Sequence, residues 1–230
     1  MNLLAFDTST ESLSVALAWR DAAGPHRLEH RGEGGRESSA TLIPTAMGLL
    51  REAGLPLAML DALAFGAGPG SFTGLRTACA VAQGLALGAS LPVLPVETLL
   101  VVAEEARHLQ GATRVMALLD ARMDEVYFAA YQHDGHGWQR QGDIVLGKPE
   151  AVSLPPGFVL AGNAFAAYGA RLPAGERIEA LPNAAALLRL APALVAQGAA
   201  VPADRALPIY VRDKVAQTTE ERRALKAASS

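Results

Sequence analysis

The order of apolar and polar positions in the first twenty residues predicts two neighbouring strands. Residues 3–6 form a continuous apolar run, which is typical of a strand buried on both faces. The run ends at Asp7 and is followed by a polar turn. Apolar and small polar residues then alternate over residues 12–17, as expected for a strand with one face toward a core. The pattern therefore predicts a hairpin with an aspartate at the end of its first strand.

The same order of patterns returns in the second half of the chain. Residues 115–119 form an apolar run that ends at Asp120, and residues 125–131 follow after a short turn. Later in each half another apolar run leads into a glycine, at Gly66 and at Gly162. Two halves with matching order predict a duplicated α/β unit.

A short polar linker at residues 110–113 is the expected boundary between the halves. We expect one subdomain over residues 1–109 and a second over residues 114–212. Residues 213–230 are charged and polar and are expected to form a tail.

Two stretches of the first half predict helices with different surroundings. Residues 38–53 carry a wide apolar stripe at helical spacing, which a single packed face would bury. Residues 77–96 contain no charged residue, and the helical part, residues 77–89, is apolar on all sides. Such a helix must be covered on more than one side, by its own sheet and by either a second helix or another chain. The sequence leaves both alternatives open.

A glycine-rich segment precedes this apolar helix. Residues 66–74 contain four glycines between an apolar run and the helix, a pattern that predicts strand, loop and helix, with Ser71 able to cap the helix. Backbone N–H groups at a helix N-terminus can hold an anion. The loop lacks the lysine of a Walker motif, and Thr73 stands where the dinucleotide fingerprint has a glycine. A phosphate-binding loop and a purely structural turn are therefore both open.

Composition and charge narrow the class of protein. Half of the 230 residues are hydrophobic and 19% are charged, which indicates a globular chain. The net charge of −3 does not provide the basic surface of an independent nucleic-acid binder. Cys79 is the only cysteine, so no disulfide can form within one chain, and it is expected to be a small buried residue in a cytoplasmic protein. No signal peptide or membrane span is expected.

One pair of histidines has the spacing of a metal motif. His26 and His30 are four residues apart, which places two side chains on one face of a helix. Gly24 and Pro25 precede the pair and further glycines follow it, so a strand or a loop is expected there instead. We predict no metal site.

Residues 68–76, Gly-Pro-Gly-Ser-Phe-Thr-Gly-Leu-Arg, resemble the signature of the TsaB family of bacterial tRNA threonylcarbamoyladenosine biosynthesis proteins. Residues 7–10, 120–123 and 208–212 resemble further segments of that family at the expected spacing. Val211 and Glu37 depart from the family pattern, which has leucine and histidine there. The resemblance implies the duplicated actin-like (ASKHA) fold, with two mixed sheets flanked by helices.

The resemblance also implies a function. The family supplies a non-catalytic partner subunit that acts with the catalytic subunit TsaD and the ATPase TsaE to form threonylcarbamoyladenosine beside the tRNA anticodon. It implies that this chain is not itself an enzyme, that it contacts tRNA only indirectly and that it binds no cofactor alone. An ATP or ADP site at the junction of the complex stays open, as does a homodimer in the partner's absence.

The resemblance assigns two groups of residues. Two helices of the first half, residues 38–53 and 74–89, are expected to bind the TsaD-like chain, and Ala82→Glu is expected to abolish association without unfolding. The expected partner-binding residues are Leu42, Ala46, Leu49, Leu50, Leu75, Ala78, Cys79 and Ala82. The degenerate phosphate loops are expected to comprise Asp7, Thr8, Gly68, Gly70 and Ser71.

An active enzyme of the same fold is the main alternative. In an ATP-dependent small-molecule kinase, Asp7 would hold a metal, the glycine loop would meet phosphate and Asp120 would be the candidate acid or base. In a metallopeptidase, His26 and His30 would be ligands on a helix, which the flanking glycines and Pro25 disfavour.

Overall fold

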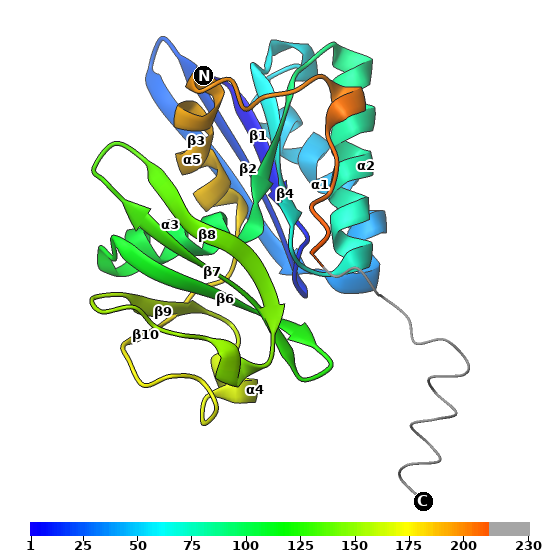
Figure 1. Ribbon diagram of the computed structural model, residues 1–230. Helices are drawn as coiled ribbons and strands as arrows, with labels where there is room; N and C mark the ends of the chain where they lie inside the picture. The colour runs from blue at the N-terminus through cyan, green and yellow to red at the C-terminus, as the bar shows by residue number, and fades with distance from the viewer. Residues whose placement is uncertain (212–230) are drawn as a thin grey trace, which may run out of the picture.

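The protein is described by a computed structural model covering residues 1–211, and its strands form two five-stranded sheets (Figure 1). The first sheet has the order β3-β2-β1-β4-β5 and the second the order β10-β9-β6-β7-β8. The strands of the first sheet are β1 (Leu3–Asp7), β2 (Ser12–Asp21), β3 (Gly24–Glu33), β4 (Ala62–Gly68) and β5 (Val93–Glu97). Those of the second are β6 (Arg114–Arg122), β7 (Glu125–His133), β8 (Trp138–Gly147), β9 (Val159–Gly162) and β10 (Arg177–Glu179).

The two sheets repeat one pattern of strand pairing. In the first sheet β1 pairs antiparallel with β2 and parallel with β4, and in the second β6 pairs antiparallel with β7 and parallel with β9. The outer strands repeat the pattern, because β2–β3 and β7–β8 are antiparallel whereas β4–β5 and β9–β10 are parallel. The predicted duplicated α/β fold with two mixed sheets is confirmed.

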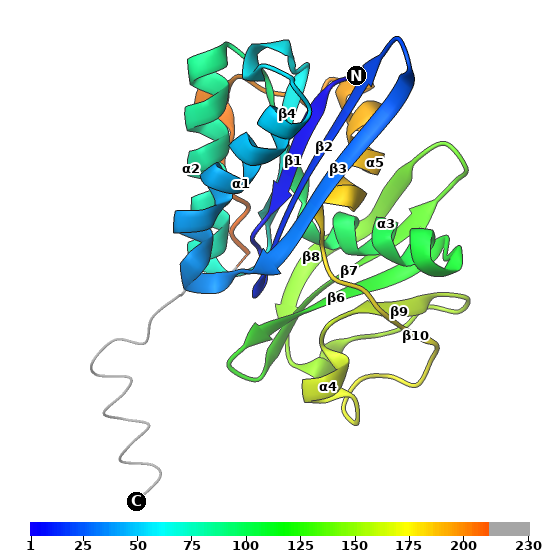
Figure 2. The same cartoon turned by 180° about the vertical axis from the view of Figure 1, so that it is seen from behind.

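Five α-helices lie in the described part of the chain, and the two halves exchange their last long helix. Their bounds are α1 (Ser38–Glu52), α2 (Phe72–Ala89), α3 (Thr98–Gln110), α4 (Phe165–Tyr168) and α5 (Ala184–Ala196). Helices α1 and α2 pack on one face of the first sheet, and α5 packs on its opposite face. Helix α3, which leaves the first half, packs on the second sheet (Figure 2). None of these helices is long and apolar enough to cross a membrane.

Residues 110–113 lie between the last strand of the first sheet and the first strand of the second, but residues 184–211 do not belong to the second subdomain as predicted from sequence. Helix α5 packs against β1, β2 and β4 of the first sheet. The segment after α5 also returns to the first half, where Val201 pairs with Val93. Residues 184–211 therefore complete the first subdomain. Arg212 and the tail predicted over residues 213–230 lie outside the described residues.

This returning segment, residues 201–211, runs along β4 and α2. The backbone N–H of Ile209 donates to the carbonyl of Ala67 at 2.7 Å. The carbonyl of Ala206 accepts hydrogen bonds from the Cys79 thiol and from the Gln83 side chain. Burial raises the pKa of the Cys79 thiol, and its side chain fills the core beneath this segment. Cys79 is thus the small buried residue that its neighbours predict.

Side-chain caps mark the start of α2 and of α5. Ser71 Oγ accepts from the N–H of Gly74 at the start of α2, as predicted, and Asn183 Oδ1 accepts from the N–H of Ala186 at the start of α5. Helices α1 and α3 have no side-chain cap, and Ser38 and Thr98 are their first residues. The Thr98 hydroxyl instead accepts from the N–H of Gly68 at 2.9 Å.

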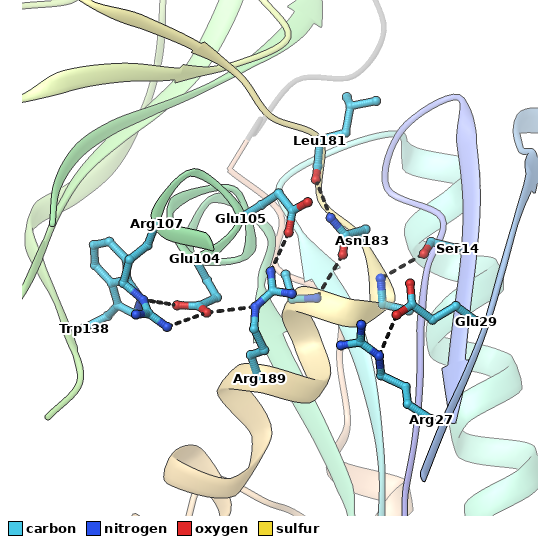
Figure 3. A network of polar contacts seen from close by, with 12 residues as sticks. Ser14, Arg27, Glu29, Glu104, Glu105, Arg107, Trp138, Leu181, Asn183 and Arg189 are labelled. Carbon is cyan, nitrogen blue, oxygen red and sulfur yellow. Dashed lines mark hydrogen bonds and ion pairs between the residues drawn. The ribbon is translucent and has the colours of Figure 1, made fainter. Parts of the chain in front are cut away.

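A buried group of charges joins α3, α5 and β8 between the two sheets (Figure 3). The carboxylate of Glu104 accepts hydrogen bonds from the guanidinium groups of Arg107 and Arg189 at 2.9 Å and from the Trp138 indole at 3.0 Å. Arg189 also pairs with Glu105. Burial alone would raise the pKa of Glu104, but the donors from Arg107, Trp138 and Arg189 hold it below its usual value. The network ties the two halves together through the helices that they exchange.

Candidate functional site

A cleft of about 570 Å³ opens between the two hairpin turns at the carboxyl ends of β1 and β6. One wall is made by the turn after β1 and the loop before α2, and the other by the turn after β6. Residues 209–211 line it as well. The polar and charged residues of the cleft are Ser9, Thr10, Glu11, Ser12, Ser71, Thr73, Asp120, Arg122, Tyr127, Asn163 and Tyr210.

Asp7, one of the residues expected in the degenerate phosphate loops, is buried beneath the wall that the turn after β1 forms. The Asp7 carboxylate is buried and accepts from the backbone N–H and the hydroxyl of Ser9 through Oδ1, at 2.9 and 2.7 Å. Its Oδ2 has no hydrogen-bond partner among the described residues. A Cβ placed on Gly66 would lie 1.8 Å from this Oδ2. Burial raises the pKa of Asp7, and the carboxylate does not line the cleft.

The glycines of the loop allow close backbone packing against the first hairpin. A Cβ on Gly74 would lie 1.8 Å from the carbonyl oxygen of Thr8, and one on Gly70 would lie 2.5 Å from that of Ser9. The Thr8 hydroxyl donates to the carbonyl of Gly74, and the N–H of Ser71 donates to the carbonyl of Ser9, both at 2.7 Å. The Thr8 hydroxyl and the Ser71 N–H, which could otherwise face a phosphate, therefore donate to backbone carbonyls of the protein itself.

The five residues predicted for degenerate phosphate loops consequently fall into two groups. Gly70 and Ser71 line the cleft, whereas Asp7, Thr8 and Gly68 do not. Gly68 packs against the returning segment instead, because a Cβ there would lie 2.5 Å from the carbonyl oxygen of Ile209.

The opposite wall carries Asp120, the candidate acid or base of the kinase alternative. Its carboxylate accepts from the N–H of Arg122 at 2.8 Å and from the Tyr168 hydroxyl at 3.1 Å. The side chain of Arg122 forms ion pairs with Asp120 and, across the mouth of the cleft, with Glu11 of the first hairpin. Asp120 therefore organises its own turn, and Arg122 links that turn to the first half.

The histidine pair lies on strand β3, as the flanking residues predict. His26 is bonded to Asp21 at 2.8 Å and is stacked on Trp19 with ring centroids 5.0 Å apart. Within residues 1–211, no three histidine, cysteine, aspartate or glutamate side chains gather closely enough to hold a metal ion.

The second candidate site is the outer surface of α1 and α2, and here the residues predicted from sequence are wrong. All of them lie in the core beneath the helices, facing the sheet or the returning segment. They are Leu42, Ala46, Leu49, Leu50, Leu75, Ala78, Cys79 and Ala82, and each is at most 8% exposed. Ala82 is fully buried, so Ala82→Glu would place a charge in the core and would unfold the chain, contrary to the expectation from sequence.

The small and aliphatic residues that are exposed on the same two helices define a different surface, which we call the α1–α2 face. It comprises Ala40, Ile43 and Pro44 of α1 and Ala80, Gly84, Leu87 and Gly88 of α2. Leu87 is 74% exposed and Ile43 is 44% exposed. A Cβ added at Gly84 or Gly88 would meet no atom within 4 Å. The surface is apolar and leaves room for another backbone to approach closely.

Sequence reasoning missed these residues although a signal was available. Apolar residues of a helix that repeat in phase with the 3.6-residue period face the chain's own sheet. The residues out of phase with that stripe, such as Ile43 and Leu87, are the ones left exposed.

A groove of about 510 Å³ adjoins this face between the first turns of α1 and α2. Its walls are Ser39, Phe72, Thr73, Arg76, Thr77, Ala80 and Val81. Phe72 and Thr73 line both the groove and the cleft, so the first turn of α2 separates the two hollows.

Three comparisons identify the relatives of this chain. The profile of the family described as "TsaD: tRNA N6-adenosine threonylcarbamoyltransferase" matches residues 29–219. The chain is 40% identical to the tRNA threonylcarbamoyladenosine biosynthesis protein TsaB of Escherichia coli, over 94% of this chain and 96% of that protein. It is 38% identical to TsaB of Haemophilus influenzae, over 94% and 95% of the two chains. The solved structure of YeaZ from Pseudomonas aeruginosa matches with a TM-score of 0.84 and 42% identity, covering 91% of this chain and 99% of that one.

Proposed function

Because the chain belongs to the TsaB family of tRNA threonylcarbamoyladenosine biosynthesis proteins, we propose that it is a partner subunit in the formation of that nucleoside. In this proposal the chain docks a TsaD-like catalytic subunit, works with a TsaE-like ATPase and performs no chemistry itself. The match to the TsaD family over residues 29–219 supports a pairing of two chains with related folds.

The observation that carries the proposal is the α1–α2 face. Leu87 exposes a large apolar side chain beside Gly84 and Gly88 on α2, and Ile43 exposes another on the neighbouring helix α1. Exposed apolar surface of this kind marks sites of protein–protein contact. Because these helices already pack on the first sheet with their opposite sides, the exposed side is free to bind a second chain.

The arrangement of the cleft supports a non-catalytic role. Asp7 is sealed beneath Gly66, and Asp120 is engaged by Arg122 and Tyr168. A kinase of this fold would need a carboxylate that reaches metal-bound phosphate. We propose that this subunit binds no cofactor on its own, and that any ATP or ADP is held at the junction with the catalytic subunit.

The remaining assignments follow from charge and cysteine content. We propose that tRNA is bound mainly by the catalytic subunit, since the net charge of −3 gives this chain little attraction for phosphates. A single buried cysteine accords with a cytoplasmic location.

The test is a reconstituted reaction with tRNA, threonylcarbamoyl adenylate, a TsaD relative and a TsaE relative. We expect the modified nucleoside, measured by mass spectrometry, to form only when this chain is added. We expect no ATP hydrolysis by the chain alone. Full modification without the chain, or ATP turnover by the isolated chain, would contradict the proposal.

A further inference from the structure

Three side chains form an exposed cluster at the start of α2, where the returning segment passes the helix. The guanidinium carbon of Arg76 lies 3.8 Å from the ring centroid of Phe72, one helical turn earlier. Arg76 Nε donates to the Tyr210 hydroxyl at 3.0 Å. The rings of Phe72 and Tyr210 are 5.6 Å apart and tilted by 40°. The guanidinium is therefore fixed from two sides by segments 134 residues apart in sequence.

Arg76 nevertheless has no charged partner within residues 1–211. Six other arginines of the described chain, among them Arg107, Arg122 and Arg189, have carboxylate partners. The only polar contact of the Arg76 side chain is the one from Nε to Tyr210, which leaves its two terminal amino groups without an acceptor in the described chain. It is also the single charged residue of α2. An immobilised guanidinium with free donors is suited to bidentate binding of a carboxylate.

The position of the cluster indicates what it would bind. Arg76 and Phe72 line the groove that adjoins the α1–α2 face, so a chain docked on that face would reach both side chains. Phe72 is 39% exposed and Tyr210 is 49% exposed. Aromatic residues and arginine are enriched among the residues that dominate the affinity of interfaces.

We propose that Arg76 is the polar anchor of the interface and binds an aspartate or glutamate of the TsaD-like subunit. The carboxylate sits in the groove between α1 and α2, while apolar residues of the same partner cover the α1–α2 face. Arg76 lies at the start of α2, beside the start of α1, whereas the other exposed charges of the two helices, Arg51 and Glu52, lie in the last turn of α1. This distribution fits a partner surface that is apolar with an acidic residue opposite Arg76. This inference rests on the proposed function, because it names the contact that fixes the partner on this face.

The first test is charge reversal with matched controls. We expect Arg76→Glu to weaken binding to the TsaD relative at least 100-fold in calorimetry, and Tyr210→Phe to weaken it several-fold because the guanidinium loses its orienting partner. Arg20→Glu makes the same charge change on the exposed end of β2, where residue 20 points away from α1, and we expect it to bind like the parent. Circular dichroism checks that each variant is folded.

The second test identifies the carboxylate. Arg76→Lys keeps the charge and supplies a primary amine, so a carbodiimide can couple it to a carboxylate in direct contact. The only other lysines are Lys148, Lys214 and Lys226, which keeps background coupling low. We expect a cross-linked peptide joining residue 76 to an acidic residue of the TsaD relative.

The outcomes separate the two proposals. If the parent chain does not bind the TsaD relative, the proposed function fails. If the parent binds and Arg76→Glu binds equally well, only the anchor assignment is overturned. Coupling of residue 76 to Glu37 or Glu52 of a second copy would likewise overturn it, in favour of a homodimer contact.

Discussion

Gly66 leaves the space that the carboxylate of Asp7 occupies, because a Cβ at position 66 would lie 1.8 Å from Asp7 Oδ2. The contact closes the first hairpin against β4 and keeps the aspartate out of the cleft. The residue that would hold a metal in an active relative of this fold is here a buried structural group.

Because of this contact, we expect a single methyl group added at position 66 to destabilise the fold. We expect Gly66→Ala to lower the free energy of unfolding by about 1–3 kcal/mol, because the added carbon must displace a buried side chain. Gly84→Ala is the control: its Cβ meets no atom within 4 Å, and alanine should raise stability by about 0.5–1 kcal/mol in a helix. Urea denaturation measures both, and equal stability of Gly66→Ala and the parent would refute the packing.

Burial of Asp7 also predicts a pH dependence. Desolvation raises the pKa of this carboxyl above its value in the unfolded chain. The folded state therefore binds the proton more tightly, so the contribution of Asp7 to stability is present at low pH and is lost as pH rises through the folded pKa. We expect the Asp7→Asn variant to lose less stability than the parent as the pH is raised above the pKa of an unfolded aspartate, about 4. Identical pH profiles of unfolding would contradict the assignment.

The ion network around Glu104 predicts a pH dependence of stability that is opposite to that of Asp7. The donors around Glu104 hold its pKa below the usual value, so its contribution is present above the unfolded pKa and is lost on acidification. We expect Glu104→Gln to destabilise the chain by about 1–3 kcal/mol at neutral pH, because Arg107 loses its carboxylate partner and Arg189 keeps only Glu105. Glu179→Gln on β10 is the exposed control and should change stability by less than about 0.5 kcal/mol. Thermal unfolding of the two variants and the parent measures these changes in stability.

The strands and their duplication could be predicted because the buried strands are short continuous apolar runs with turn residues after them. The exchange of α3 and α5 could not, because an apolar helix stripe such as that of α5 does not specify which sheet it covers. The packing of residues 201–211 on the first half could not be predicted for a related reason. Ala206 and Ile209 contact α2 and β4, which are distant from them in sequence.

The candidate site was predictable at the level of elements and not of residues. The absence of charge over residues 77–96 indicates a helix covered on several sides, but the apolar stripe it contains marks the core-facing side. Gly66, Gly70 and Gly74 resemble a phosphate loop in sequence because close backbone packing and anion binding both require residues without a side chain.

Binding of a TsaD-like subunit to the α1–α2 face can be tested by the native mass from light scattering, on the chain mixed with its cognate TsaD relative. We expect a species at the summed mass of one chain of each. We expect this species to be absent for Gly84→Arg, which fills open space on the face, and present for Ala193→Arg, at an exposed site of α5. No change in mass beside a folded, active TsaD relative, or a complex that forms equally with Gly84→Arg, would contradict binding at this face.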